Sequence, residues 1–280
     1  MKNDILKDFI LRSLAEDIGT GDHSSLASIP SDACGNAMLL VKAKGIIAGL
    51  SVAKCLFEIV DSDLKTEFLI NDGALVKHGD IAFYVKGNLQ SILKSERLVL
   101  NIMQRMSGIA TSTHEYVTKL QGLKTRILDT RKTTPGFRFF EKEAVRIGGG
   151  MNHRMGLYDM IMLKDNHIDY AGGIKNALAR TREYLREHRL NLKVEIEARN
   201  TEDVEIIIAA GGADRIMLDN FNLENTREAV RLINGRIETE SSGGITLDTI
   251  RSYAECGVDF ISVGALTHHI KSLDMSLKAI

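Results

Sequence analysis

Positively charged side chains recur beside glycines and threonines in the middle of the chain. Five of them are candidates for binding an anion: Arg131, Lys132, His153, Arg154 and Lys164. Arginine binds a carboxylate through a bidentate fork, and lysine acts as a compact point charge. A single run of charge is usually a solvated surface. Cations that return in successive segments, each near glycines or hydroxyls such as that of Thr130, favour a polyanionic ligand.

Two acidic residues, Glu197 and Asp219, end later apolar runs of the sequence. A pair of carboxylates near phosphates and cations indicates a magnesium ion that arrives with a diphosphate substrate. The alternative is that these acids pair with the lysines of the same site. Glu195 lies two residues before Glu197, so both side chains point to the same face of a strand. The pattern therefore leaves open which of the two faces the ligand.

Glycines follow the last two apolar runs, in Ser241-Ser-Gly-Gly244 and in Gly264-Ala265. Glycine turns let backbone N–H groups close around a phosphate, as at the mouths of α/β barrels. Either turn alone could be an ordinary tight turn. Because the two turns come after consecutive strands, they favour a phosphate site. Its expected residues are Ser242, Gly243, Gly244, Gly264 and Ala265.

The elements that must position these residues alternate between short apolar runs and helical segments. The last four runs end near residues 197, 219, 241 and 263, about 22 residues apart. That spacing fits one strand and one helix of a βα unit. Helices are expected over 201–210, 223–233 and 247–256. Since barrel enzymes carry their sites at the carboxyl ends of the strands, we expect a barrel over a doubly wound sheet.

The first hundred residues have a different, mixed pattern. Apolar spacing predicts helices over 4–16, 50–60 and 91–109. Strands are expected over 38–47, 66–70 and 81–85, with turn residues between the last two. These residues therefore indicate an α+β domain that precedes the barrel.

Composition excludes several classes of protein. Of the 280 residues, 44% are hydrophobic and 26% charged, and the net charge is -1, which argues for neither a nucleic acid nor a membrane partner. Three cysteines are too few and too widely spaced for a disulfide framework. The first residues carry charges where a signal peptide needs an apolar run, and no stretch is apolar for long enough to cross a bilayer. We expect a cytoplasmic protein.

The longer motifs together resemble those of the quinolinate phosphoribosyltransferases, also called carboxylating nicotinate-nucleotide pyrophosphorylases. They cover nearly the whole chain in the order of that family. The matching motifs are Glu96-Arg-Leu-Val-Leu-Asn101, Ser107-Gly-Ile-Ala-Thr111, Asp129-Thr-Arg-Lys-Thr-Thr-Pro-Gly136, Gly148-Gly-Gly, Asn152-His-Arg154, Lys164-Asp-Asn-His-Ile168, Met217-Leu-Asp-Asn220, Glu240-Ser-Ser-Gly-Gly-Ile245 and Gly264-Ala-Leu-Thr267.

The resemblance implies a fold and a division of the chain. It implies an N-terminal α/β sandwich domain over residues 1–108 and an open α/β barrel of fewer than eight strands over 109–267. It also implies a final helix over 268–280 that packs back on the first domain.

The resemblance further implies an activity. The family transfers the phosphoribosyl group of phosphoribosyl pyrophosphate to quinolinate with decarboxylation, giving nicotinate mononucleotide, carbon dioxide and diphosphate for NAD biosynthesis. Mg²⁺ and no organic cofactor are expected. Quinolinate is expected to be bound by Arg97, Thr130, Arg131, His153, Arg154 and Lys164. The expected catalytic residues are Lys132, Glu197 and Asp219, and the last two are the expected Mg²⁺ site.

Within a homodimer, the resemblance implies that Arg97 reaches the active site of the neighbouring subunit. Three alternatives remain at this point. One is the molybdenum-transport-associated branch of the same family, against which the complete Arg-Lys-Thr-Thr-Pro-Gly and Asn-His-Arg motifs argue. The second is a barrel aldolase or isomerase that acts on a sugar phosphate. The third is an anion-binding protein without catalytic activity.

Overall fold

The computed structural model describes residues 2–280, which form two compact units. The first unit holds the residues up to 114 together with 134–149 and 269–280. The second holds residues 115–133 and 150–268. Residues 134–149 thus group with the first unit, whereas we expected all of 109–267 to form one barrel domain.

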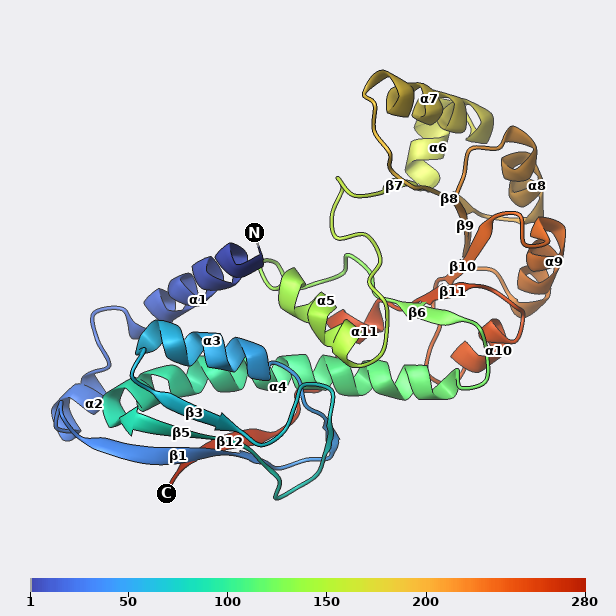
Figure 1. Cartoon of the computed structure of the whole chain (residues 1–280). Helices are drawn as coiled ribbons and strands as arrows, with labels where there is room; N and C mark the ends of the chain where they lie inside the picture. The colour runs from blue at the N-terminus through green and yellow to red at the C-terminus, as the bar shows by residue number, and fades with distance from the viewer. Residues whose placement is uncertain (1) are drawn as a thin grey trace. The chain divides into compact units, whose positions relative to one another are not determined.

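The first unit is built on an antiparallel sheet with strand order β12-β1-β5-β3. Its strands are β1 (Cys34–Val41), β3 (Lys65–Phe68), β5 (Ile81–Asn88) and β12 (Met275–Ala279). Helices α1 (Lys2–Ile18), α3 (Leu50–Val60) and α4 (Leu89–Lys119) lie on one face of this sheet (Figure 1). The smaller elements are α2 (His23–Ser28), β2 (Gly45–Ile46), β4 (Leu75–Val76) and α5 (Arg138–Ile147). The unit is therefore mixed α/β, as the N-terminal pattern predicts.

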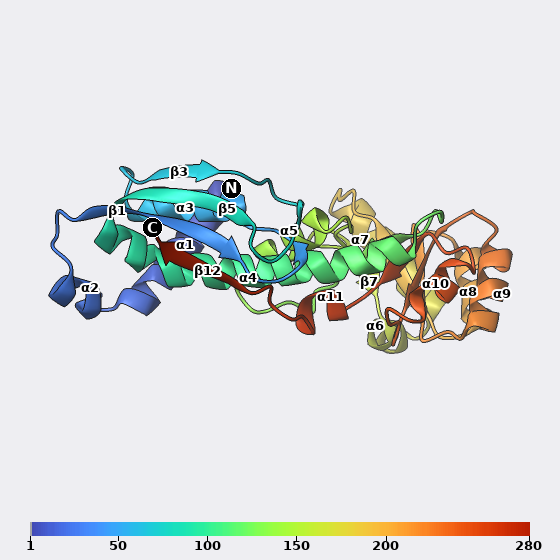
Figure 2. The same ribbon diagram turned by 90° about the horizontal axis from the view of Figure 1, so that it is seen from below.

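Strand β12 replaces the helix that we expected over 268–280, so that prediction is wrong. Met275 and Leu277 are buried while Lys278 is exposed, which is the period of two typical of a strand rather than of a helix. Ala279 pairs with Ala37 and Met275 with Val41, so β12 completes one edge of the sheet. Figure 2 shows β12 running beside β1.

The second unit is built on six parallel strands in the order β6-β11-β10-β9-β8-β7. They are β6 (Arg126–Leu128), β7 (Ile161–Leu163), β8 (Val194–Ala198), β9 (Arg215–Asp219), β10 (Glu238–Ser242) and β11 (Phe260–Ser262). Strands β6 and β7 are consecutive in the sequence, yet they form the two edges. The sheet is thus an α/β barrel left open between β6 and β7, which confirms the expected barrel of fewer than eight strands.

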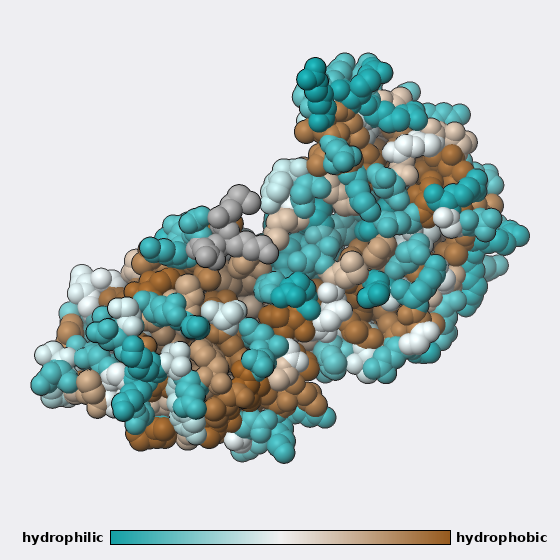
Figure 3. Space-filling view, in the orientation of Figure 1, coloured by the Kyte–Doolittle hydropathy of each residue, from teal (hydrophilic) through white to brown (hydrophobic). Residues whose placement is uncertain are grey.

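Helices cover the outer side of this barrel (Figure 1). They are α6 (Asp165–Ala171), α7 (Ile174–Glu187), α8 (Thr201–Ala210), α9 (Leu223–Ile233) and α10 (Ile250–Ala254). The short helix α11 (Ala265–His268) follows β11. Residues such as Ile196, Ile216 and Leu218 are fully buried and alternate with the polar residues of the same strands. The exposed face of α7 is hydrophilic (Figure 3). The barrel thus places its apolar packing between strands and helices.

The inner side of the barrel is unusually charged. Glu195 and Glu197 alternate along β8, and Arg215 and Asp219 lie two positions either side of Met217 on β9. Glu240 on β10 pairs in register with Met217. Barrel interiors are more often filled by branched apolar side chains.

Within residues 2–280, no helix combines the length and the apolar character that crossing a membrane requires.

Half-buried Asp259, in the turn before β11, gives a prediction about stability. The Asp259 carboxylate accepts hydrogen bonds from the Lys124 ammonium (2.9 Å) and from the Thr239 N–H (2.9 Å) and hydroxyl (2.8 Å). Burial raises the pKa of Asp259, but these bonds outweigh it and the net pKa is lowered. Because the folded state then binds the proton less well than the unfolded chain, the stabilisation is present at neutral pH and is lost as pH falls through the folded-state pKa.

We therefore expect Asp259→Asn to lower the free energy of unfolding by about 1–3 kcal/mol at pH 7. The difference from the parent protein should shrink below pH ~4, where the parent carboxylate also becomes protonated. Urea unfolding at both pH values measures it. The exposed Asp248→Asn variant is the control and should change little at either pH. If Asp259→Asn lowers the free energy of unfolding by the same amount at both pH values, the proposed link between the Asp259 pKa and stability is contradicted.

Candidate active site

A cavity of about 850 Å³ opens at the carboxyl ends of the barrel strands, within the size range of small-molecule sites. Its walls include the predicted residues Thr130, Arg131, Lys132, His153, Arg154, Lys164, Glu197, Asp219, Ser242, Gly243, Gly244, Gly264 and Ala265. Arg97 is the predicted residue that is not among them. It lies exposed on α4 in the first unit. The barrel unit alone therefore brings together the expected cations, acids and glycines.

The loop after β6 carries Arg131 and Lys132. The Thr130 hydroxyl accepts a hydrogen bond from the Lys132 N–H (3.0 Å), and the Thr267 hydroxyl donates to the Lys132 carbonyl (2.7 Å). The Lys132 backbone is thus held from both sides while its side chain is exposed. The Thr130 hydroxyl thus holds the backbone of its own loop. Its position next to the cations in the sequence did not predict this role.

Residues 150–160 run beside β6 at the open edge of the barrel, but they do not form a full strand. The Met151 N–H donates to the Ile127 carbonyl (2.8 Å), and the Asp129 N–H donates to the Met151 carbonyl (3.1 Å). The buried Asp129 carboxylate then accepts the His153 N–H (2.8 Å). These bonds fix the backbone between the edge of the sheet and the cavity wall, where His153 and Arg154 lie.

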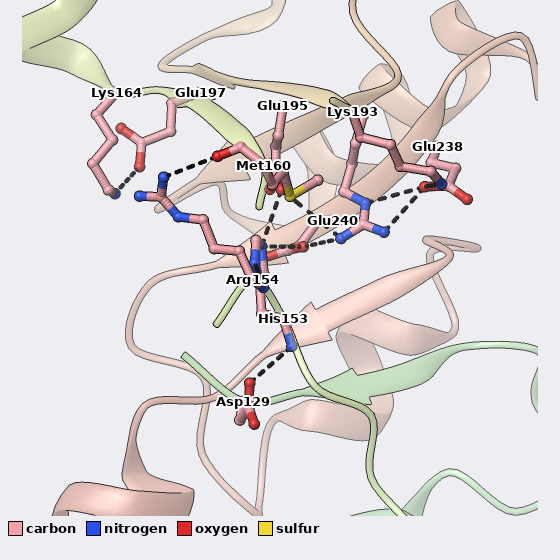
Figure 4. Close-up of polar contacts among 11 residues, drawn as sticks. Asp129, His153, Arg154, Met160, Lys164, Lys193, Glu195, Glu197, Glu238 and Glu240 are labelled. Atoms are coloured by element: carbon pink, nitrogen blue, oxygen red, sulfur yellow. Dashed lines mark hydrogen bonds and ion pairs between the residues drawn. The ribbon is translucent and has the colours of Figure 1, made fainter. Parts of the chain in front are cut away.

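Both ring nitrogens of His153 are turned toward groups of the protein (Figure 4). Nδ1 accepts the Arg154 N–H (2.6 Å), and Nε2 lies 3.0 Å from a Glu195 oxygen and 3.5 Å from a Glu240 oxygen. Burial lowers the pKa of His153 and the two carboxylates raise it. Because Nδ1 accepts the Arg154 N–H, the ring carries its proton on Nε2, where it faces the two carboxylates. Both ring nitrogens therefore contact groups of the protein beneath the cavity, although His153 also forms part of the cavity wall.

Arg154 extends its guanidinium toward the pair formed by Lys164 and Glu197 (Figure 4). Its Nη1 donates to the Met160 carbonyl (3.4 Å). Burial, and then the positive charge of nearby Arg131, lower the pKa of Arg154. Two guanidinium groups close enough to repel each other form a site that an anionic ligand would stabilise.

The acids lie on the strands across the cavity from these arginines. Glu197 accepts the Asp165 N–H (3.1 Å) and forms an ion pair with the Lys164 ammonium. Burial, and then the Glu197 charge, raise the pKa of Asp219. Glu197 lines the cavity and Glu195 is fully buried beneath it, which decides the alternative that the sequence left open.

The glycine turn after β10 has a backbone that other residues rarely adopt. Gly243 has φ +96° and Gly244 has φ +60°. A Cβ on Gly243 would lie 2.1 Å from the Asn220 side-chain oxygen, so that position has no room for a side chain. A Cβ on Gly244 would meet no atom within 4 Å. Gly264, after β11, completes this side of the cavity. Such a turn can present N–H groups to a phosphate.

Comparison with known proteins identifies the family. The family model for the quinolinate phosphoribosyl transferase C-terminal domain matches residues 109–278, and that for the N-terminal domain matches residues 22–107. The chain belongs to the quinolinate phosphoribosyl transferase family. The predicted resemblance is thus confirmed.

Individual members of this family are similar over nearly the whole chain. The chloroplastic nicotinate-nucleotide pyrophosphorylase [carboxylating] of Arabidopsis thaliana is 49% identical, and the match covers 98% of this chain and 82% of the relative. A probable nicotinate-nucleotide pyrophosphorylase [carboxylating] of Bacillus subtilis is 43% identical, covering 97% and 92%. The solved nicotinate-nucleotide pyrophosphorylase from Francisella tularensis is 41% identical with a TM-score of 0.93, covering 99% and 97%.

Several residues of the cavity in this family member were not predicted from the sequence. They are Met162, Asp165, Met217, Asn220, Glu240, Ile245, Thr246, Ser262, Val263 and His268. Most lie one or two positions from a predicted residue on the same strand or turn. Alternation could have revealed Glu240 and Met217, because they lie two residues before Ser242 on β10 and before Asp219 on β9 and face the same side as these residues.

The glycine turn gives a second prediction. If it holds a phosphate, Gly244→Ala should fill the open space at the turn and weaken inorganic phosphate binding at least about tenfold, or ~1.4 kcal/mol. Both this change and Gly235→Ala place alanine at positive φ (+60° and +69°) with no atom near the new methyl, so both should cost about 1 kcal/mol of stability. Gly235 lies outside the cavity.

Phosphate titrations followed by the backbone amide signal of Gly264 measure the effect, with thermal unfolding beside them. The expected outcome is equal loss of stability in the two variants and loss of phosphate binding in Gly244→Ala alone. Unchanged phosphate binding in Gly244→Ala would place the phosphate elsewhere.

Proposed function

We propose that the protein transfers the phosphoribosyl group of phosphoribosyl pyrophosphate to quinolinate and releases carbon dioxide, as the step of NAD biosynthesis that forms nicotinate mononucleotide. The observation that carries this proposal is one cavity that brings together two arginines, two lysines, two acids and a glycine turn. Relatives named as carboxylating nicotinate-nucleotide pyrophosphorylases support the same reaction.

Quinolinate fits the cationic side of the cavity. Its two adjacent carboxylates carry two negative charges, and Arg131, Arg154 and Lys164 offer three cations around one space. Repulsion between the two guanidinium groups is relieved when a dianion lies between them. His153 lies at the base of the same wall. We assign the carboxylates of quinolinate to this side.

Phosphoribosyl pyrophosphate fits the opposite side. Its 5'-phosphate is assigned to Ser242, Gly243, Gly244, Gly264 and Ala265. As diphosphate leaves, positive charge develops at the anomeric carbon of the ribose. Glu197 and Asp219 carry the negative charges that would stabilise it, and the exposed ammonium of Lys132 would stabilise the departing diphosphate.

Glu197 and Asp219 also have the donor set for Mg²⁺. Burial, and then repulsion from Glu197, raise the pKa of Asp219, so a divalent cation between or near these carboxylates would be favourable. The residues present therefore fit the ion, bound directly or through water. When bound with the substrate, Mg²⁺ would neutralise negative charge on the diphosphate.

The bonds of the reaction balance without an organic cofactor. The ring nitrogen of quinolinate forms a bond to the anomeric carbon, and the bond from that carbon to the diphosphate oxygen breaks. The ring nitrogen is then positively charged, so it stabilises the electron pair that remains on the neighbouring C2 when the C2–carboxylate bond breaks. C2 takes up a proton and carbon dioxide leaves. The protein supplies orientation and charge for these steps.

An aldolase that acts on a sugar phosphate is less well supported. Such an enzyme can use a neutral lysine amine to form a Schiff base. Lys164 is already held in an ion pair with Glu197, so its amine is not free to attack a carbonyl carbon. The three cysteines are free, which suits the cytoplasm, and we propose that the reaction takes place there.

Substrate choice tests the proposed function. Nicotinate lacks the C2 carboxylate of quinolinate, so it would leave part of the Arg131–Arg154 site without an anion. Unmade charged hydrogen bonds are costly, and we expect quinolinate to be preferred over nicotinate by at least about a hundredfold in kcat/KM. Release of diphosphate coupled to loss of quinolinate measures it. Similar kcat/KM values for the two acids would overturn the assignment.

We also propose that the enzyme is a homodimer in which Arg97 completes the neighbouring active site. Arg97 is exposed on α4, while the apolar residues Ile92, Val99 and Met103 of the same helix are buried. An exposed arginine on a long helix is available to a second subunit. The family motif Glu96-Arg-Leu-Val-Leu-Asn101 supports this role.

Complementation between inactive variants tests the shared site. Arg97→Ala and Lys164→Ala homodimers should each have very low activity. When the two are dissociated, mixed and reassociated, heterodimers should recover activity, because one site then carries both defects and the other carries neither. The matched control mixes Arg131→Ala with Lys164→Ala, whose defects lie in the same chain's cavity, and should recover nothing. No recovery in verified Arg97→Ala/Lys164→Ala heterodimers would contradict the shared site.

A further inference from the structure

Beneath the proposed quinolinate site lies a group of four buried ionisable residues, His153, Glu195, Arg215 and Glu240, which we call the buried charge cluster. Glu195 and Glu240 are 0% exposed, and the side chains of His153 and Arg215 are 4% and 9% exposed. Glu195 and Arg215 do not line the cavity. Three of the four residues have no part in the reaction as proposed above, so their burial needs another reason.

The cluster is held together by two N–H donors, the Arg215 guanidinium and the His153 ring, which both face the same two carboxylates. Arg215 Nη1 lies 3.0 Å from Glu240 Oε2 and 3.8 Å from Glu195 Oε2. Its guanidinium stacks on the ring of Phe260 at 4.0 Å and also pairs with Glu238 (3.0 Å). His153 Nε2 faces the same two glutamate oxygens from the other side. Removal of either donor would leave a buried carboxylate short of charge, which is strongly unfavourable.

A metal ion is not the ligand that this geometry favours. His153, Glu195 and Glu240 do have the donor atoms of a metal site. However, Nδ1 of His153 accepts the Arg154 N–H, so the ring proton lies on Nε2, and that nitrogen has no lone pair to offer. The Arg215 guanidinium also already supplies positive charge to the same two carboxylates.

His153 joins this cluster to the residue that we assign to quinolinate. Segment 150–160 has no regular secondary structure, and the His153 ring reaches from it to β8 and β10. The opposite ring nitrogen accepts the N–H of Arg154. This orientation of the ring places Nε2 close to the two glutamates and Nδ1 against the Arg154 N–H, so the ring helps to determine where the backbone of Arg154 lies. Figure 4 shows His153 between the glutamates and Arg154.

We propose that Glu195, Glu240 and Arg215 are positioning residues that act through His153 to hold Arg154 for the carboxylates of quinolinate. On this proposal, which rests on the proposed function, His153 acts through Arg154 and does not itself contact the substrate. The cluster then serves as the fixed support that an open barrel lacks at its missing strand. Its loss should weaken quinolinate binding and leave the phosphoribosyl pyrophosphate side unchanged.

A double-mutant cycle on purified enzyme tests the coupling. We expect His153→Ala and Glu240→Ala each to raise the quinolinate dissociation constant at least about tenfold. The double variant should be no worse than the weaker-binding single variant, because the two residues act as one unit. KM for phosphoribosyl pyrophosphate should stay within about twofold, since none of the four cluster residues is assigned to that substrate. Calorimetry measures quinolinate binding and steady-state assays measure KM and kcat.

Two further variants separate positioning from loss of folding. Glu240→Gln keeps an oxygen that can accept from His153 and Arg215, and it should recover most of the affinity lost in Glu240→Ala. His188→Ala, at an exposed histidine outside the cavity, is the matched control and should bind quinolinate normally. A crystal structure of His153→Ala should show Arg154 displaced while Arg131 and Lys164 stay in place. The crystal structure requires only that the His153→Ala variant folds, so it tests the proposal even if the Glu240 variants are unstable.

The outcomes are distinguishable. Losses that multiply in the double variant, or weakened quinolinate binding with Arg154 unmoved in His153→Ala, would show that His153 contacts the ligand independently and would overturn the proposal. Unchanged quinolinate affinity in both single variants would overturn it too. If the parent enzyme binds phosphoribosyl pyrophosphate but not quinolinate, the proposed function itself fails, and that result is visible before any variant is made.

Discussion

The pairing of His153 and Arg215 with two fully buried glutamates is the interaction on which the barrel depends. Barrel interiors are commonly filled by branched apolar side chains that need no partners. Here Glu195 and Glu240 have no exposed surface, so two negative charges must be neutralised within the protein. Coulomb attraction is strong in such surroundings, but it compensates for lost hydration only when donors are well placed. The arrangement of β8, β9 and β10 is therefore constrained by charge as well as by packing.

The gap between β6 and β7 explains why a side-chain link to the buried glutamates is needed beside segment 150–160. Between β6 and β7 a backbone ladder is missing, and segment 150–160 makes only a short pairing with β6 through Met151. A closed barrel would hold such a segment by strand hydrogen bonds along its length. The His153 ring provides the link to β8 and β10 instead. A gap in the topology is thus bridged by a side chain, and the arginine that we assign to quinolinate follows it directly in sequence.

Much of this arrangement could be predicted from the sequence, because the relevant signals are local. The helices Leu50–Val60, Thr201–Ala210 and Leu223–Ile233 have the predicted bounds, since each shows helical apolar spacing over its full length. The error at β12 has a non-local cause, because its partner β1 lies near the opposite end of the chain. The direction of the His153 ring was likewise beyond local signals, since it depends on glutamates from two later strands.

The order of strands also separates the cavity into two electrostatic halves. Its arginines and Lys132 come from the loop after β6 and from segment 150–160, while the acids and the glycine turn follow β8, β9 and β10. Chain order around the barrel therefore places cations at the open edge and carboxylates on the continuous sheet. On the proposed function, the open edge binds a dianion that is charged before reaction. The continuous sheet faces the ribose, whose positive charge develops only as diphosphate leaves, so its carboxylates stabilise the transition state more than the bound substrate.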